Sequence, residues 1–505
     1  MKQWQRVLLF VVILLIFIKI VAHVTVLGHR RPQMFKELTQ QECPPPVLLI
    51  PGLGGSRLYA SKKGEKRWKR CWVTWAGMFP EIGKRANKWR QDMSITYNSD
   101  TSRFEDADNV DITAWRKPNY DRSGRFRLTP DFGGVEGCSN LMKARIHLTW
   151  QFQGVINWMR KELHYRSMED GGPNLTSLFG STYDFRKITD PEYWQSFCAQ
   201  MKDLIEYIVH LRKQPVRIVS HSLGSVALLA FLTRYLPSIL VPNAVAAWKQ
   251  RYIHEWMSIN GSFGGSSKAL RSAVSGDSHG MAILCKKSCN SWYQPLSKQM
   301  SAVLWMLPHP LIFQGPPVIS VSNQRTYCAS KSDISTLFKH LGNKGAIDAY
   351  EDTLPPLLTL DPPDVKVLAV VCTTPSDSES VSTPLQLMYR VSNKYDEYAE
   401  SPFSAIHNVH EKCERQFYEQ LWGSSSNYSP TSIQNCLRGD CDIKDMRGDG
   451  TVPYISLMVP RLWMPGAVSP NRQTVRIARF NTEKLGHTSV LFDEAFMRQV
   501  KPFFM

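Results

Sequence analysis

Residues 216–224 read Val216-Arg-Ile-Val-Ser-His-Ser-Leu-Gly224, and this stretch decides the expected fold. A short β-branched run at residues 216–219 leads directly into the pattern Ser-x-Ser-x-Gly, centred on Ser222. The residues that follow, 226–235, have the apolar spacing of a helix. A strand, a sharp turn and a helix in this order are typical of a nucleophile elbow, in which the central serine lies at a strained turn above a sheet edge.

The same alternation of elements continues on both sides of this stretch. Val47-Leu-Leu-Ile50, followed by Pro51-Gly52, reads as a buried strand that enters a tight loop. Further strands are predicted at residues 365–371 and 475–480, and helices at residues 144–163 and 197–212. Strands that alternate with helices predict an α/β fold with a mainly parallel sheet.

Composition and two atypical regions complete the expected organisation. The chain has 505 residues, 43% of them apolar and 21% charged, which excludes a disordered, collagen-like or polytopic membrane protein. Residues 61–130 lose periodicity and are basic and aromatic, whereas residues 270–360 are Pro-rich and irregular, like an inserted cap. We therefore expect one large domain over residues 45–505 that contains both regions.

The N-terminus, residues 1–30, predicts entry into the secretory pathway. Residues 7–18 are twelve apolar residues behind Lys2 and Arg6. The largely apolar stretch over residues 7–27, interrupted by Lys19, His23 and Thr25, is 21 residues long. That length spans about 30 Å of hydrocarbon. The segment is either an uncleaved signal anchor, which leaves the protein on a membrane, or a cleaved signal peptide, which leaves it secreted, lysosomal or vacuolar.

The cysteines fit a protein of the secretory pathway better than they fit a metal site. Eleven cysteines is an odd number, and an oxidising lumen favours local pairs such as Cys285 with Cys289 or Cys436 with Cys441. No second ligand pair at zinc spacing follows, and neither an EF-hand loop nor an HExxH pair occurs. We expect neither a metal nor a cofactor.

Ser222 needs a base and an orienting acid, because an unactivated serine is a weak nucleophile at neutral pH. In this architecture the order along the chain is serine, acid, histidine. His487 is the one histidine after Asp449, and it follows the strand predicted at 475–480 by a short loop. Asp449 lies between two glycines that let the chain turn beneath the histidine, and Asp445 is the alternative acid.

Two main-chain N–H groups are candidates for an oxyanion hole. Leu223 directly follows the nucleophile, and Leu53 lies in the glycine-rich loop after the first strand. The same glycines would suit a phosphate cradle, but neither G-K-[ST] nor G-x-G-x-x-G follows, which argues against nucleotide binding.

From about residue 45 to its end, the chain resembles the lecithin:cholesterol acyltransferase family, which includes lysosomal phospholipase A2 and phospholipid:diacylglycerol acyltransferase. The resemblance is carried, in order, by Ile50-Pro-Gly-Leu-Gly-Gly-Ser-Arg-Leu58, Cys71-Trp72, Asp131-Phe-Gly-Gly-Val135, Tyr183-Asp-Phe-Arg186, His221-Ser-Leu-Gly224, Ser262-Phe-Gly-Gly265, Ser275-Gly-Asp277, Trp305-Met-Leu-Pro308 and Gly448-Asp-Gly-Thr-Val452. It implies an α/β-hydrolase core with a membrane-binding subdomain at residues 61–130 and a cap or mobile lid at residues 270–360.

The resemblance also implies roles for individual residues. Ser222 would be the nucleophile and Asp449 and His487 the rest of a triad, with Leu53 and Leu223 as oxyanion donors. The chain departs from the family at two positions. Phe185 stands where members usually have Trp, near the expected acyl pocket, and Ser220 stands where the elbow usually has Gly.

Nearly half of the net charge of +17 lies in one segment. Residues 62–90 hold ten Lys or Arg against two Glu, interleaved with tryptophans, a pattern suited to an anionic membrane surface. The candidate membrane-binding residues are Lys66, Arg67, Trp68, Lys69, Arg70, Trp72 and Trp75. The alternative is a solvated basic loop that packs on its own aromatic residues. Such a pattern can also bind single-stranded nucleic acid, but the predicted entry into the secretory pathway argues against that partner.

Together these features predict a serine-dependent phospholipid acyl-hydrolase or acyltransferase that works at a membrane surface. The acyl-enzyme on Ser222 would pass its chain to water or to a lipid alcohol such as a sterol or diacylglycerol, and the sequence does not choose between them. The alternatives are a neutral-lipid or general carboxylester hydrolase, and a non-catalytic lipid-binding protein.

Overall fold

The computed structural model describes residues 44–505 with several gaps. The gaps are residues 66, 75–76, 78–82, 143–150, 278–289, 316, 322–324, 374–383, 392–405, 414–431, 439–446, 465–473 and 482–484. The predicted N-terminal segment at residues 1–30 lies outside the described residues, as do Cys285, Cys289 and Cys441, whereas Cys436 is a free thiol. Within the described ranges, no helix is both long enough and apolar enough to cross a bilayer.

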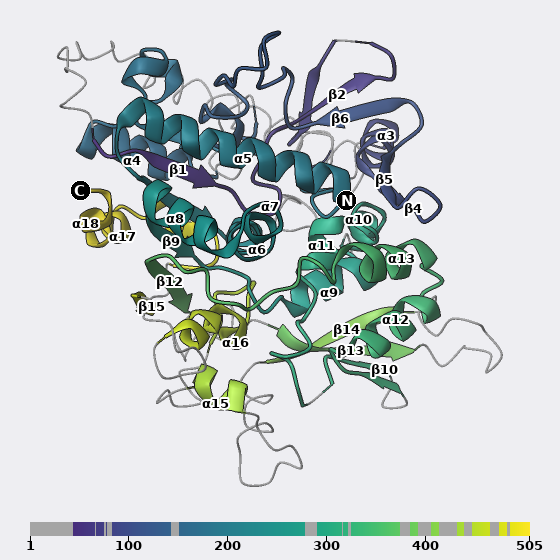
Figure 1. The fold of residues 1–505 in the computed structure, drawn as a ribbon. Coiled ribbons are helices and arrows are strands. Elements are labelled where there is room, and N and C mark those ends of the chain that lie inside the picture. Colours follow the sequence, from purple (N-terminus) through teal and green to yellow (C-terminus); the bar gives the residue numbers. More distant parts are fainter. Residues whose placement is uncertain are drawn as a thin grey trace, which may run out of the picture. The chain divides into compact units, whose positions relative to one another are not determined.

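A six-stranded sheet forms the centre of the fold, in the order β15-β12-β9-β8-β1-β7 (Figure 1). Its strands are β1 (Val47–Ile50), β7 (Leu178–Gly180), β8 (Val216–His221), β9 (Ile253–Ile259), β12 (Val367–Thr373) and β15 (Val475–Asn481). Every pairing in it is parallel, which confirms the predicted mainly parallel sheet. The carboxyl ends of the strands therefore meet at one edge, where parallel α/β folds place their sites.

Both faces of the centre of this sheet are buried, which explains why β1 and β12 are continuous apolar runs rather than alternating ones. The edge strand β15 differs, since Arg476 and Arg479 in it are exposed. In β1, Leu48 and Ile50 belong to one core cluster, and Val47 and Leu49 belong to another. The first cluster includes side chains of α5 (Pro191–Arg212), α6 (Leu223–Ala230) and α8 (Pro242–Tyr252). The second includes side chains of α4 (Gln153–Leu163), α17 (Glu494–Gln499) and α18 (Lys501–Phe504).

The basic region after β1 has a small sheet of its own. It contains the antiparallel strands β3 (Lys69–Trp72), β2 (Leu58–Lys62) and β6 (Val110–Thr113), helix α3 (Lys84–Met93), and a hairpin of β4 (Ile95–Asn98) and β5 (Arg103–Asp106). These strands are four or five residues long, too short to show a clear alternation in the sequence.

The region expected to be irregular is largely helical, so that part of the sequence interpretation is wrong. Its helices are α9 (Ser267–Val274), α10 (Asn290–Ser297), α11 (Ser301–Trp305), α12 (Lys331–His340) and α13 (Lys344–Thr353). A second sheet, β11-β10-β13-β14, combines β10 (Ile319–Val321) and β11 (Arg325–Tyr327) with β13 (Pro384–Val391) and β14 (Ile406–Cys413). The second sheet therefore combines strands from before and after residue 360.

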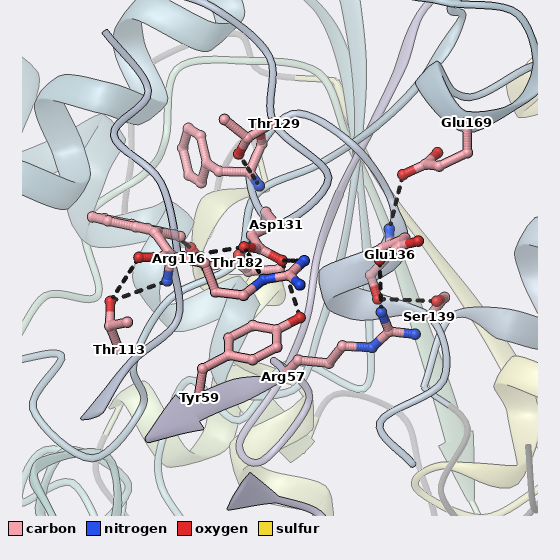
Figure 2. Close-up of polar contacts among 12 residues, drawn as sticks. Arg57, Tyr59, Thr113, Arg116, Thr129, Asp131, Glu136, Ser139, Glu169 and Thr182 are labelled. Carbon is pink, nitrogen blue, oxygen red and sulfur yellow. Dashed lines mark hydrogen bonds and ion pairs between the residues drawn. The ribbon is translucent and has the colours of Figure 1, made fainter. Parts of the chain in front are cut away.

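A buried carboxylate joins the small sheet to the core (Figure 2). The Asp131 side chain is only 3% exposed; Tyr59 Oη donates to its Oδ1 at 3.0 Å, and the Arg116 guanidinium donates to both of its oxygens at 2.8 Å. Beside it, Arg57 forms an ion pair with Glu136 at 3.0 Å. These contacts fix the start of β2, and with it the glycine-rich loop that precedes β2.

Candidate active site

The nucleophile candidate Ser222 lies at a strained turn between β8 and α6. Its φ of 53° and ψ of −124° are unfavourable for a residue with a side chain, and its N–H donates to the Ile259 carbonyl at 3.0 Å. Gly224 makes the turn feasible, since a Cβ there would lie 2.5 Å from the Ile50 carbonyl oxygen. The elbow geometry therefore depends on the sequence Ser-x-Gly.

Ser220, which replaces the usual glycine of the elbow, is part of a buried hydroxyl cluster. Trp256 Nε1 donates to Ser220 Oγ at 2.7 Å, and the Ser220 and Ser225 hydroxyls are 2.8 Å apart. Ser258 Oγ lies 3.0 Å from Ser225 Oγ. The departure from the pattern thus adds hydrogen bonds between β8, β9 and α6 directly beneath Ser222.

The structure brings Ser222, His487 and Asp449 into one hydrogen-bonded row. His487 Nε2 lies 2.8 Å from Ser222 Oγ, and His487 Nδ1 lies 2.6 Å from Asp449 Oδ2. The other carboxylate oxygen of Asp449 accepts the N–H groups of Thr451 and Val452 at 2.9 and 2.7 Å. The Asp449 side chain is fully buried, and both of its oxygens accept hydrogen bonds. It can therefore orient His487 as a base for Ser222. Asp445, the alternative acid, lies outside the described residues.

His221 and Asn260 hold the main chain of His487, a role that the sequence interpretation missed. His221 Nε2 lies 2.8 Å from the His487 carbonyl oxygen, to which Asn260 Nδ2 also donates at 3.2 Å. Because a carbonyl only accepts, His221 carries its proton on Nε2. Burial, with a smaller contribution from His487, lowers the pKa of His221 to about 3, so its ring is neutral at moderate pH. Local patterns carry no signal for this contact, because 266 residues separate its partners.

The two oxyanion candidates flank Ser222. Leu223 is the first residue of α6, so its N–H has no acceptor within the helix. Leu53 lies on the loop after β1 and lines the same cavity as Ser222. In the described part of the chain neither N–H has a main-chain acceptor, so both are free to meet a ligand oxygen.

A cavity of about 340 Å³ opens beside Ser222 and His487. Its apolar lining comes mainly from Leu53, Trp72, Val73, Met93, Leu141, Phe185, Tyr293, Leu296, Met300 and Met306. Phe185 packs against Trp72, with ring centroids 5.1 Å apart. An apolar cavity next to a nucleophile suits a substrate with a hydrocarbon chain.

Trp72 was predicted at the membrane surface, and this placement is wrong. The residue is 8% exposed, its indole N–H donates to the Gly54 carbonyl at 2.7 Å, and its ring stacks on Trp89. Because the indole N–H is hydrogen-bonded and the ring is packed inside the protein, Trp72 lines the cavity instead.

The other basic-segment residues lie on or near β3. Arg67 and Lys69 are exposed, whereas Trp68 and Arg70 are half-buried, and burial lowers the pKa of Arg70. Lys66 and Trp75 lie outside the described residues. Among the residues described, no cluster of three or more His, Cys, Asp or Glu side chains could hold a metal ion.

A parallel sheet, a serine at a strained strand-to-helix turn, and a histidine and a buried aspartate in contact with it define an α/β-hydrolase of the serine type. The sequence model described as "Lecithin:cholesterol acyltransferase" matches residues 68–495. The chain therefore belongs to the lecithin:cholesterol acyltransferase family of phospholipases and acyltransferases.

Similar proteins from plants and animals carry names of the same kind. The chain is 26% identical over 322 residues to "Lecithin-cholesterol acyltransferase-like 1" of Oryza sativa subsp. japonica, covering 62% of this chain and 64% of that protein. It is 23% identical over 340 residues to "Lysosomal phospholipase A and acyltransferase" of Mus musculus, covering 64% and 71%. It is also 26% identical over 279 residues to "Phosphatidylcholine-sterol acyltransferase" of Mus musculus, covering 53% and 54%.

Proposed function

We propose that this enzyme removes an acyl chain from a glycerophospholipid through an acyl-enzyme on Ser222. The observation that carries the proposal is the hydrogen-bonded row of Ser222, His487 and Asp449 at the edge of a largely apolar cavity. The names of the relatives support a phospholipid as the acyl donor.

In the first half of the reaction, Ser222 Oγ attacks the ester carbonyl while His487 Nε2 takes the hydroxyl proton. The N–H groups of Leu53 and Leu223 stabilise the oxyanion that forms. When the intermediate collapses, His487 returns the proton to the alcohol oxygen of the leaving lysophospholipid, and the acyl chain stays on Ser222.

In the second half, an acceptor hydroxyl attacks the acyl-enzyme while His487 again takes a proton. Water as acceptor gives a free fatty acid, and a lipid alcohol such as a sterol or diacylglycerol gives a new ester. Ser222 regains its proton from His487, and the cycle needs no cofactor.

Phosphatidylcholine vesicles labelled in the sn-2 acyl chain test this proposal, with and without cholesterol or diacylglycerol. We expect wild-type protein to release labelled fatty acid or form a labelled ester, and Ser222→Ala to do neither while remaining folded. Hydrolysis of a short soluble ester without any phospholipid product would instead identify a general carboxylester hydrolase.

We further propose that the enzyme reaches its substrate in the secretory pathway, on a membrane with anionic lipid. The predicted N-terminal segment at residues 1–30 supports the secretory pathway. Arg67 and Lys69 support the anionic membrane, because both are exposed on a strongly basic segment, and each such cation near an anionic surface contributes about 1 kcal/mol. Reversing both to Glu should weaken binding to phosphatidylserine vesicles. Reversing exposed Lys331 and Lys339 of α12 is the matched control, and equal effects of the two pairs would contradict the surface role.

A further inference from the structure

The carboxyl end of β9 contacts the main chain of both the nucleophile and the base. The carbonyl of Ile259, the last residue of β9, accepts the Ser222 N–H at 3.0 Å. The next residue, Asn260, donates from Nδ2 to the His487 carbonyl at 3.2 Å. Two consecutive residues at one strand end are therefore hydrogen-bonded to Ser222 and His487, which are 265 residues apart in the sequence.

Asn260 has a backbone conformation that residues with a side chain rarely adopt. Its φ is 47°, in the left-handed region, which asparagine tolerates better than most residues other than glycine. Its N–H donates to the Val370 carbonyl at 2.9 Å, and its Oδ1 accepts the Cys372 N–H at 2.8 Å. Both partners belong to β12, so two hydrogen bonds to the neighbouring strand hold Asn260 in this conformation.

The partners of the Asn260 amide allow only one orientation of it. The main-chain N–H of Cys372 can only donate, so the amide oxygen faces it, and the His487 carbonyl can only accept, so the NH₂ group faces that carbonyl. Asn260 is fully buried, and it is not among the described residues that line the cavity. Its amide therefore connects β12 to the loop of the histidine, and it acts on the site without contacting the substrate.

The main chain of His487 is held on both sides of its Cα. Its N–H donates to the Asp449 carbonyl at 2.9 Å, and its own carbonyl accepts from Asn260 and from His221 Nε2. Because the imidazole is attached to this main chain, these contacts decide where its Nε2 lies. That nitrogen is 2.8 Å from Ser222 Oγ, and a general base must lie within about 2.6–3.2 Å of the group whose proton it takes.

We propose that Asn260 is a positioning residue for the base: it holds the His487 main chain at the strand end that also holds Ser222. The proposal rests on the proposed function, in which His487 takes the proton of Ser222. Without the amide, His221 is the remaining described donor to the His487 carbonyl, and the buried Cys372 N–H loses its acceptor. The loss should therefore appear in kcat rather than in the binding of the lipid.

The test measures kcat and KM of the full chain on phosphatidylcholine micelles for Asn260→Gly and Asn260→Asp. Glycine adopts the same φ without strain but removes the amide, so kcat should fall about 10-fold, the effect of one hydrogen bond. Aspartate keeps an oxygen for the Cys372 N–H but turns its other oxygen toward the His487 carbonyl, so kcat should fall roughly 100-fold. KM should keep its wild-type value in both variants.

Irreversible labelling of Ser222 with a fluorophosphonate separates positioning from folding. The endpoint of labelling counts the folded sites, and we expect both variants to reach the wild-type endpoint. Asn119→Gly and Asn119→Asp are the matched controls, because Asn119 is also buried and its amide is hydrogen-bonded to Gln200 and Thr129. Their kcat per labelled site should equal that of wild type.

An unchanged kcat in Asn260→Asp would overturn the proposal, and so would a change confined to KM. A fall in kcat that the labelling endpoint accounts for in full would also overturn it, since Asn260 would then only support folding. In each of these cases, cleavage of phosphatidylcholine by the wild-type protein leaves the proposed function standing. If wild type neither cleaves phosphatidylcholine nor is labelled at Ser222, both proposals are overturned.

Discussion

Gly52 lies so close to Ser222 that a Cβ at position 52 would be 2.9 Å from the Ser222 Cβ, closer than two carbons can approach without displacement. The same Cβ would lie 3.0 Å from the His221 carbonyl oxygen and 3.1 Å from His221 Nδ1. The loop after β1 can therefore lie against the nucleophile only because residue 52 has no side chain. This contact sets the distance between the two oxyanion donors.

Gly52→Ala should consequently lower kcat by about 100-fold, because displacing a catalytic group by about an ångström costs about that much. Steady-state kinetics on phosphatidylcholine micelles measure this effect. Gly171→Ala is the matched control, since its Cβ would come no closer than 3.4 Å to the nearest atom, a normal contact. Equal kcat values for the two variants would show that the loop has room to move.

Asp449→Asn should lower kcat by roughly 10⁴-fold while leaving the fold intact. The new amide oxygen can still accept from Thr451 and Val452, and its NH₂ group then faces His487 Nδ1. This stabilises the tautomer with its proton on Nε2, which cannot take the proton of Ser222. Kinetics together with circular dichroism check the prediction, and a loss below tenfold would contradict the orienting role.

Asp131→Asn should destabilise the protein by roughly 3 kcal/mol, because it leaves Arg116 and Tyr59 facing a neutral, poorly matched group. Urea unfolding measures the free energy of unfolding. Asp121→Asn, at an exposed turn, is the control and should leave the free energy of unfolding nearly unchanged. If both variants lose the same stability, the Asp131 cluster does not hold the small sheet to the core.

The buried His221 should make the protein less stable in acid. Its pKa is about 3 in the folded protein, against an ordinary value of 6.5, so only the unfolded chain binds this proton between those pH values. Stability therefore falls as the pH falls through this window, by about 1.4 kcal/mol per pH unit once the pH is below 6.5. Burial of His309, whose pKa is lowered to about 4, acts in the same direction.

His221→Gln keeps a side-chain N–H for the His487 carbonyl but does not titrate. Between about pH 7 and pH 5 it should lose 1–2 kcal/mol less stability than wild type, as measured by urea unfolding at each pH. The control is exposed His210→Gln. Parallel pH profiles for wild type and His221→Gln would contradict the buried neutral state.

The strands next to the site and the identity of its three catalytic candidates could be predicted from the sequence. The apolar runs of β1 and β8 and the order of Ser222, Asp449 and His487 follow from local patterns and from the chemistry that a serine nucleophile requires. The burial of Trp72 could not be predicted, because its partners Gly54 and Trp89 are each 17 or 18 residues away in sequence. Interleaved charges and tryptophans look the same whether the rings face a membrane or a cavity.

The central claim is that Ser222 carries the acyl chain between donor and acceptor. Wild-type protein mixed with phosphatidylcholine and quenched in acid within one turnover tests it directly, by mass spectrometry of the proteolytic peptides. We expect the peptide that contains Ser222 to gain the mass of one acyl group, and Ser222→Ala to show no acylated peptide. Product formation with the acyl group on another residue, or retained in Ser222→Ala, would contradict the account.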